Sequence, residues 1–158
     1  MALKILILVL FLLIFWQDTK DRLVYWFLYP LVGGLAFFIQ ASYNGYFVIL
    51  TNTAVNVLLI GLILGTAFVY SKIIMKRQFV NESIGIGDIL LFIFLCCTFS
   101  PLPFIILLVF SLMFSLVVHV YLRNRSAHTT VPLAGYISLF FFAVYFTSFF
   151  IEPKYLFA

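Results

Sequence analysis

The chain has 158 residues, of which 66% are hydrophobic and only 9% are charged. A soluble domain carries about 25% charged residues, so this composition excludes an ordinary soluble enzyme or binding domain. The net charge of +4 arises from Lys and Arg residues scattered between apolar runs, which excludes the clustered basic face of a nucleic-acid-binding protein. The composition therefore predicts an all-α, polytopic helical bundle in a lipid bilayer, formed by residues 1–158 as one domain.

Six apolar segments follow one another along the chain, separated by short polar or turn-forming segments. Segments of this length and composition predict about six transmembrane helices. The expected spans cover residues 3–17, 24–40, 46–70, 84–99, 104–122 and 131–151, with a polar loop at 18–22 after the first span. The first span lacks the small-residue cleavage site of a signal peptide, which predicts that it is retained.

Several residues inside the expected spans predict how the helices pack. Pro30 in the second span predicts a kink, and the adjacent Gly33 and Gly34 predict a close helix–helix approach. Asn52 and Asn56 in the third span are four residues apart and share a helix face. We expect them to form hydrogen bonds between helices rather than face lipid.

Basic residues predict the orientation in the membrane, because loops rich in Lys and Arg remain in the cytoplasm. The loops after the second and fourth spans carry no basic residue, and only Lys4 and Lys154 lie at the chain ends. The loops after the first, third and fifth spans together carry Lys20, Arg22, Lys72, Lys76, Arg77, Arg123 and Arg125. We therefore expect these three loops in the cytoplasm and both termini outside.

Two aspartates occupy the predicted cytoplasmic edge of the membrane. Asp88 follows the glycines Gly85 and Gly87 at the start of the fourth span, and Asp18 follows the first span. A carboxylate is costly in lipid and marks a functional site, while glycine allows positive φ and close approach of another group. Two carboxylates a few ångströms apart cannot both ionise, so one keeps its proton. Such a dyad can hydrolyse an amide, since one carboxylate takes a proton from water while the other polarises the carbonyl.

Other catalytic machinery is sparse in this sequence. No Ser has a convincing base partner, and neither His nor Cys occurs at metal-ligand spacing, so we expect no metal and no cofactor. Cys96 and Cys97 are adjacent in an apolar run, which favours packing over a disulfide. His119 lies one turn before Arg123, and we interpret it as an interfacial or bundle-facing residue rather than a catalytic base.

Three motifs together resemble the type IV prepilin peptidase family of membrane aspartyl proteases. The segment from Gly85 to Asp88 has the form GxGD, which is weak alone. Asp18 is followed by basic residues two and four positions on, Lys20 and Arg22, and by the aliphatic Val24 six positions on. The segment 130–135, which contains Pro132, is similar to a Pro-containing segment of the family.

The resemblance covers nearly the whole chain and implies a specific activity. It implies cleavage of the leader of prepilin or pseudopilin-like proteins at the cytoplasmic face of a bacterial or archaeal cytoplasmic membrane. Asp18 and Asp88 would be the catalytic pair, with Gly85, Gly87, Lys20, Arg22 and Pro132 as substrate-binding or supporting residues. No oligomeric state follows from the sequence.

The chain departs from the family pattern at a few positions. Leu90 stands where the family often has Lys, and Tyr25–Trp26 where it often has Pro-Asn, which affects substrate contacts more than the dyad. Asp21 is interpreted as a solvated loop residue. The chain also lacks the cysteine-rich insert of the family members that methylate their product, which predicts a protease-only form.

Two other functions remain open at this point. A GxGD protease of the presenilin and signal-peptide-peptidase kind would need more spans and a Tyr-Asp motif inside a span. A small non-enzymatic transporter or assembly subunit could use the aspartates for ions or structure, although transporters place charges nearer the midplane.

Overall fold

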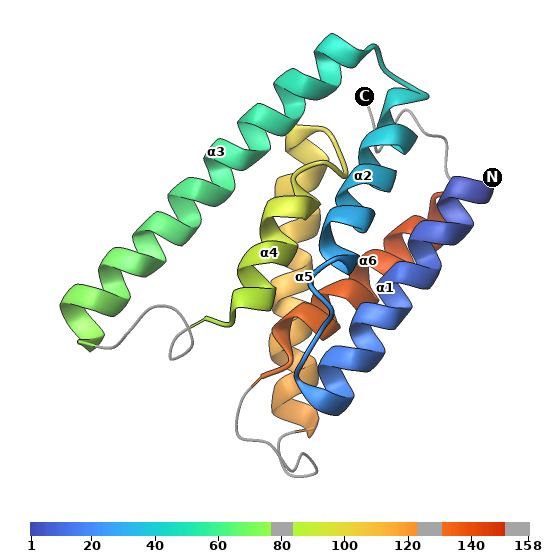
Figure 1. Ribbon diagram of the computed structural model, residues 1–158. Coiled ribbons are helices and arrows are strands. Elements are labelled where there is room, and N and C mark those ends of the chain that lie inside the picture. The colour runs from blue at the N-terminus through green and yellow to red at the C-terminus, as the bar shows by residue number, and fades with distance from the viewer. Residues whose placement is uncertain (77–83, 123–130, 151–158) are drawn as a thin grey trace.

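The computed structural model describes residues 1–76, 84–122 and 131–150, and they form a bundle of helices (Figure 1). No strand occurs among these residues, which confirms the predicted all-α fold. The helices are α1 (Ala2–Asp21), α2 (Leu28–Ala41), α3 (Tyr46–Tyr70), α4 (Ile86–Leu95), α5 (Pro101–Leu122) and α6 (Leu133–Thr147), and a π-helical turn, η1 (Ser71–Met75), extends α3.

Three of these helices are long and apolar enough to cross a membrane. They are α1, α3 with its extension to Ile73, and α5. The helices α2, α4 and α6 are also apolar but have only 14, 10 and 15 residues. At about 1.5 Å per residue they cover roughly 15–22 Å, less than the ~30 Å hydrocarbon core. The described residues therefore contain the predicted number of six α-helices, but only three of these helices have the length of a membrane span.

The first two helices have boundaries that differ from the prediction. The loop predicted at 18–22 is wrong, because α1 continues to Asp21 and ends where Arg22 adopts a left-handed conformation with φ 56°. The Thr19 hydroxyl donates to the Phe15 carbonyl over 2.7 Å, so the polar residues extend the helix beyond the apolar run. The predicted kink at Pro30 is also wrong: Pro30 lies in the first turn of α2, where its missing N–H breaks no helical hydrogen bond.

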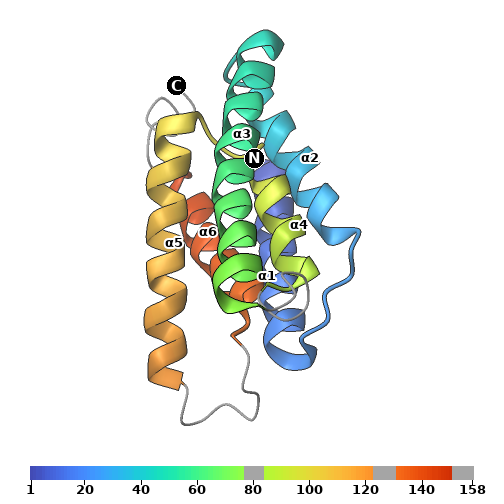
Figure 2. The same ribbon diagram turned by 90° about the vertical axis from the view of Figure 1, so that its left-hand side faces the viewer.

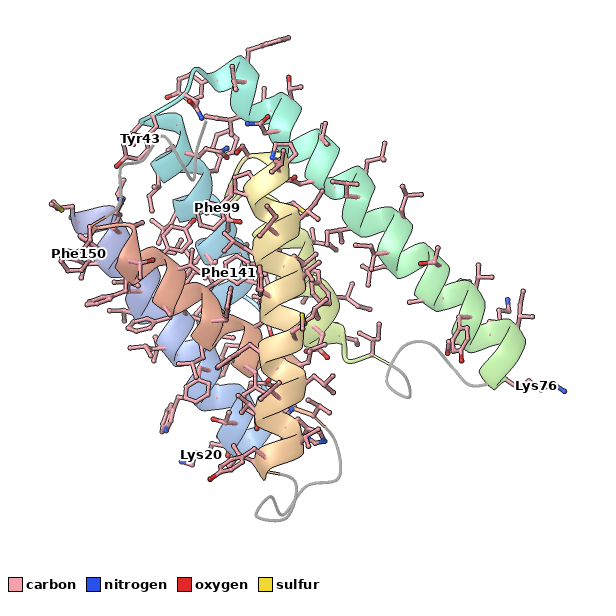
Figure 3. The ribbon with its side chains drawn as sticks, turned by 180° about the vertical axis from the view of Figure 1, so that it is seen from behind. Lys20, Tyr43, Lys76, Phe99, Phe141 and Phe150 are labelled. Carbon is pink, nitrogen blue, oxygen red and sulfur yellow. The ribbon has the colours of Figure 1, made fainter. Side chains whose placement is uncertain are left out.

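Aromatic rings from three segments form the centre of the core. Phe11 of α1, Phe99 after α4, and Phe141 and Tyr145 of α6 are fully buried. Their ring centroids are 5.2 Å apart for Phe99–Tyr145 and 6.1 Å for Phe11–Phe141, within the range of favourable aromatic contacts. Figure 3 labels Phe99 and Phe141 in this layer. The shared cluster makes α6 the central helix of the bundle.

The antiparallel helices α1 and α6 are joined by polar contacts at both ends. Near the start of α1, Lys4 is buried and its Nζ donates to the carbonyl of Ser148, the C-cap of α6, over 2.9 Å. Near the end of α1, Asp18 accepts the N–H of Gly135 over 2.6 Å. A cation at the C-terminus and an anion at the N-terminus both stabilise a helix macrodipole. The sequence of α1 thus complements both ends of α6.

Helix α3 packs against the bundle mainly through its first two thirds. Its buried residues are Ile49, Asn56 and Ile60, and the helix slants away from the others toward its C-terminal end (Figure 1). From the side it crosses in front of the bundle between α5 and α2 (Figure 2). The Asn56 amide donates to the carbonyls of Cys96 and Phe99, each over 2.9 Å. This confirms the interhelical bonding predicted for Asn56, while Asn52 is half-buried.

A small residue of α2 allows this helix to lie close to the end of α4. A Cβ on Gly33 would lie 2.7 Å from Phe94 Cδ1, whereas a Cβ on Gly34 would meet nothing within 4 Å. The close approach predicted here is therefore confirmed for Gly33 and wrong for Gly34.

Cys96 and Cys97 are both free, in agreement with the expectation that they form no disulfide.

Candidate active site

The first turn of α6 holds both of the aspartates singled out by the sequence. The N–H of Ala134 donates to Asp88 Oδ1 over 2.8 Å, and the N–H of Gly135 donates to Asp18 Oδ2 over 2.6 Å. Pro132 is the N-cap of α6. The first N–H groups of a helix have no partner within the helix and attract anions. Asp18 and Asp88 therefore satisfy two neighbouring donors at a helix N-terminus.

This arrangement brings together two carboxylates that are far apart in the sequence. Because consecutive residues are about 3.8 Å apart, oxygens bound to neighbouring N–H groups lie within roughly 9 Å of each other. Asp18 comes from the last turn of α1 and Asp88 from the first turn of α4. Tertiary packing against α6 thus places both carboxylates at one end of the bundle.

Glycines leave the space that this arrangement needs. A Cβ on Gly85 would lie 3.1 Å from Asp88 Oδ2, and one on Gly135 would lie 3.1 Å from Asp18 Oδ2. Gly85 also donates its N–H to Asp88 Oδ2 over 3.3 Å. No glycine in the described part of the chain has a positive φ. The glycines of the GxGD motif therefore serve close approach, and the positive φ that the sequence also allowed does not occur.

A cavity of about 800 Å³ lies beside the two carboxylates and is lined by both. Its walls come from the end of α1 and the segment after it, from α2, α4 and α5, and from the start of α6. Its other polar side chains are Arg22, Tyr29, Ser115 and His119. The remaining walls are mostly apolar, as in many small-molecule and peptide sites.

The basic residues of the Asp18 motif lie differently with respect to this cavity. Arg22 lines it, and its guanidinium is close enough to interact electrostatically with Asp18 and Asp88. Lys20 is exposed and lies over the Trp16 ring, with Nζ 4.9 Å from the ring centroid. Of the two basic residues predicted to support the site, the structure brings only Arg22 to it.

The remaining residues predicted from the motifs lie at or near the cavity. Leu90 and Trp26, at positions where the chain departs from the family pattern, both line it. His119 lines it from α5, which confirms a bundle-facing position. Asp21 is exposed at the end of α1: it is solvated as expected, although it ends a helix instead of lying in a loop.

The sequence analysis missed Tyr29 and Ser115. Both side chains are buried, line the cavity and have a hydroxyl oxygen without a hydrogen-bond partner among the described residues. Each is embedded in an apolar run, where no motif or spacing marks it. The only available signal was the polar group itself, since a buried hydroxyl is costly unless it is bonded.

The two carboxylates of this site can perform acid–base chemistry on a water molecule. Within residues 1–76, 84–122 and 131–150, no three His, Cys, Asp or Glu side chains are grouped so that they could hold a metal ion. The two aspartates are half-buried, share a cavity and approach it from different helices. Such a pair can bind a water molecule and move protons between it and a substrate.

Comparisons with known proteins provide no independent assignment. No protein-family model, no curated protein and no solved structure matches this chain.

Proposed function

We propose that this chain is a membrane aspartic endopeptidase that removes the leader from type IV prepilin-like proteins at the cytoplasmic face of a prokaryotic membrane. The observation that carries the proposal is the pairing of Asp18 and Asp88 on neighbouring N–H groups of α6 beside one cavity. The motifs around these two residues supply the substrate class.

The pair performs amide hydrolysis with water as the nucleophile. The ionised carboxylate takes a proton from the water molecule, and the oxygen of that water forms a bond to the scissile carbonyl carbon. The protonated carboxylate gives its proton to the carbonyl oxygen, which yields a tetrahedral diol. When the diol collapses, one of its hydroxyl groups returns a proton to the ionised carboxylate, the C–N bond breaks, and the departing nitrogen takes the proton of the other carboxyl group, so the pair again holds one proton. The products are a carboxylic acid and an amine.

The cavity suits a peptide segment. Its volume of about 800 Å³ lies within the range of roughly 300–1,000 Å³ that is typical of ligand pockets. Apolar residues such as Leu112 and Leu116 of α5 line the same cavity as the aspartates. An extended, partly apolar segment of the substrate could occupy this space with its scissile bond at the carboxylates.

In this proposal the bundle lies in the membrane with all six helices at least partly embedded and both termini outside. Lys20 and Lys76 lie toward one end of the molecule, and Tyr43 and Phe150 toward the other (Figure 3). The end with the lysines is the end of α1 that carries Asp18. Basic residues at this end favour a cytoplasmic location. The short helices α4 and α6 begin below the membrane surface, which gives water access to the dyad.

Co-expression with candidate prepilins tests this function. The substrate is recovered from membranes and its N-terminus is identified by mass spectrometry. We expect the wild-type chain to remove the leader and Asp18→Asn to leave it in place. The matched control is Asp21→Asn, which changes an exposed carboxylate three residues away on the same helix and should retain most activity. Full processing by Asp18→Asn, or loss confined to Asp21→Asn, would refute the assignment.

A further inference from the structure

The hydroxyl of Tyr29 is a buried polar group that the two-aspartate mechanism leaves unused. Tyr29 has only 1% of its surface exposed. Its Oη has no hydrogen-bond partner in the part of the chain that the structure describes. Leaving such a group unpaired in the interior of a protein is costly. A simple packing role would be filled without this cost by Phe.

The position of Tyr29 relates this hydroxyl to the carboxylates. Tyr29 lies in the first turn of α2 and lines the same cavity as Asp18 and Asp88. Both carboxylates are close enough to interact electrostatically with the hydroxyl. On the side of α4, a Cβ on Gly87 would lie 2.7 Å from Oη but 3.6 Å from Cζ. The glycine before the catalytic aspartate thus leaves room for the hydroxyl specifically.

Both aspartates accept hydrogen bonds from backbone N–H groups, and the hydroxyl of Tyr29 remains available to an acceptor on the substrate. Asp88 accepts the N–H groups of Ala134 and Gly85, and Asp18 accepts that of Gly135. The hydroxyl therefore has a proton to donate and lies at the cavity that contains the reacting groups. The acceptor that hydrolysis would bring into this cavity is the oxygen of the scissile carbonyl.

We propose that Tyr29 is a catalytic residue that donates a hydrogen bond from Oη to the scissile carbonyl oxygen and stabilises the negative charge that builds on this oxygen in the transition state, before the protonated carboxyl group gives it a proton. This role rests on the proposed peptidase function. Tyr29 forms and breaks no covalent bond and keeps its proton throughout, because the proton transfers belong to Asp18 and Asp88. A preorganised donor of this kind acts mainly on the transition state.

Replacing Tyr29 by Phe tests the role, with Tyr145→Phe as a matched control. Tyr145 is also fully buried with an unpartnered hydroxyl, but it lies outside the cavity. Initial rates of leader removal are measured on a purified prepilin in detergent over a range of substrate concentrations. We expect Tyr29→Phe to lower kcat about 100-fold, as loss of one oxyanion donor does, with KM nearly unchanged. Tyr145→Phe should keep the wild-type kcat, and neither variant should lower the melting temperature.

Gly87→Ala provides a second, independent test of the same hydroxyl. Its added methyl group should lower kcat in the wild-type background, because it displaces Oη. In the Tyr29→Phe background it should cause little further loss, since the atom that it would clash with is absent.

The outcomes separate this role from the function on which it rests. A wild-type kcat in Tyr29→Phe, with Asp18→Asn inactive, would overturn the role of Tyr29 and leave the peptidase intact. Equal losses in the Tyr29 and Tyr145 variants, or a change in KM alone, would also overturn it. A wild-type chain that cleaves no prepilin would overturn the peptidase function and this role together.

Discussion

Replacing Asp88 by Asn separates the two tasks that its carboxylate can perform. As a helix cap, Asp88 accepts the N–H groups of Ala134 over 2.8 Å and of Gly85 over 3.3 Å. As a catalyst, it exchanges a proton with water. An Asn side chain keeps one oxygen, which can still accept the N–H of Ala134, but it replaces the oxygen that accepts the N–H of Gly85 by an NH2 group and cannot exchange the proton. Ala removes both functions.

The expected effects differ strongly in size. Hydrogen bonds to a charged group contribute about 1.5–3 kcal/mol and neutral ones about 0.5–1.5 kcal/mol, so Asp88→Asn should lower the free energy of unfolding by about 1–2 kcal/mol. Asp88→Ala should lower it by a further ~1 kcal/mol, the typical contribution of a cap. Activity should instead fall by about 10³-fold or more in both variants, because general acid–base catalysis typically contributes about 10²–10⁴-fold.

The assay combines leader removal with thermal unfolding of the purified variants. We expect Asp88→Asn to be folded and inactive, and Asp18→Asn combined with Asp88→Asn to be no less active than either alone, since residues that act as a unit are not additive. The opposite pattern would show that the carboxylates only cap α6. In that pattern Asp88→Asn processes the substrate normally, and Asp88→Ala loses activity in proportion to its stability.

Three further predictions follow from the geometry and the composition. Gly135→Ala places a Cβ 3.1 Å from Asp18 Oδ2 and should lower the rate of cleavage at least about tenfold, since small displacements of catalytic groups are costly. In the control Gly34→Ala the added Cβ meets nothing within 4 Å, so the rate should stay unchanged. Equal activity of the two variants would contradict the role of the contact between Gly135 and Asp18. Single cysteines at Ser42 and Lys76 should react with an impermeant reagent from opposite sides of the membrane, and labelling from one side would refute the topology. Cleavage should proceed with EDTA and without S-adenosylmethionine and leave a free N-terminal amine; a methylated product made by this chain alone would disprove the protease-only form.

The sequence predicted the helices best where an apolar run alone determines the structure. The third helix begins as expected at Tyr46 and its α-helical part ends as expected at Tyr70, although a π-helical turn continues it to Met75. A long and mostly apolar run determines these limits. The predicted end of the first helix failed, since a drop in hydrophobicity marks the limit of lipid contact and not the limit of hydrogen bonding. The helix continues through Thr19 and ends only at Arg22.

The two carboxylates could be predicted from the sequence, but their binding partners could not. Asp18 and Asp88 stand out because charges are rare in such a chain. The donors that hold them are backbone N–H groups of Ala134 and Gly135, and backbone groups carry no residue signature. The resemblance pointed to the segment 130–135 as a whole, and the packing of α6 against α1 and α4 shows which two N–H groups of that segment bind the carboxylates.

The contacts at both ends of the α1–α6 pair fix the rotation of α1 about its own axis relative to α6. Lys4 and Asp18 must both face α6 for their contacts with Ser148 and Gly135 to form. One residue inserted between Lys4 and Asp18 would turn one end of α1 by about 100° relative to the other, so only one of the two contacts could survive. An insertion of four residues would come within about 40° of the original phase but lengthen α1 by about 6 Å. Lys4 at the opposite end of α1 thus helps to position Asp18, and a change in the apolar stretch between them should affect the contact of Asp18 with Gly135 according to helical phase rather than distance from Asp18.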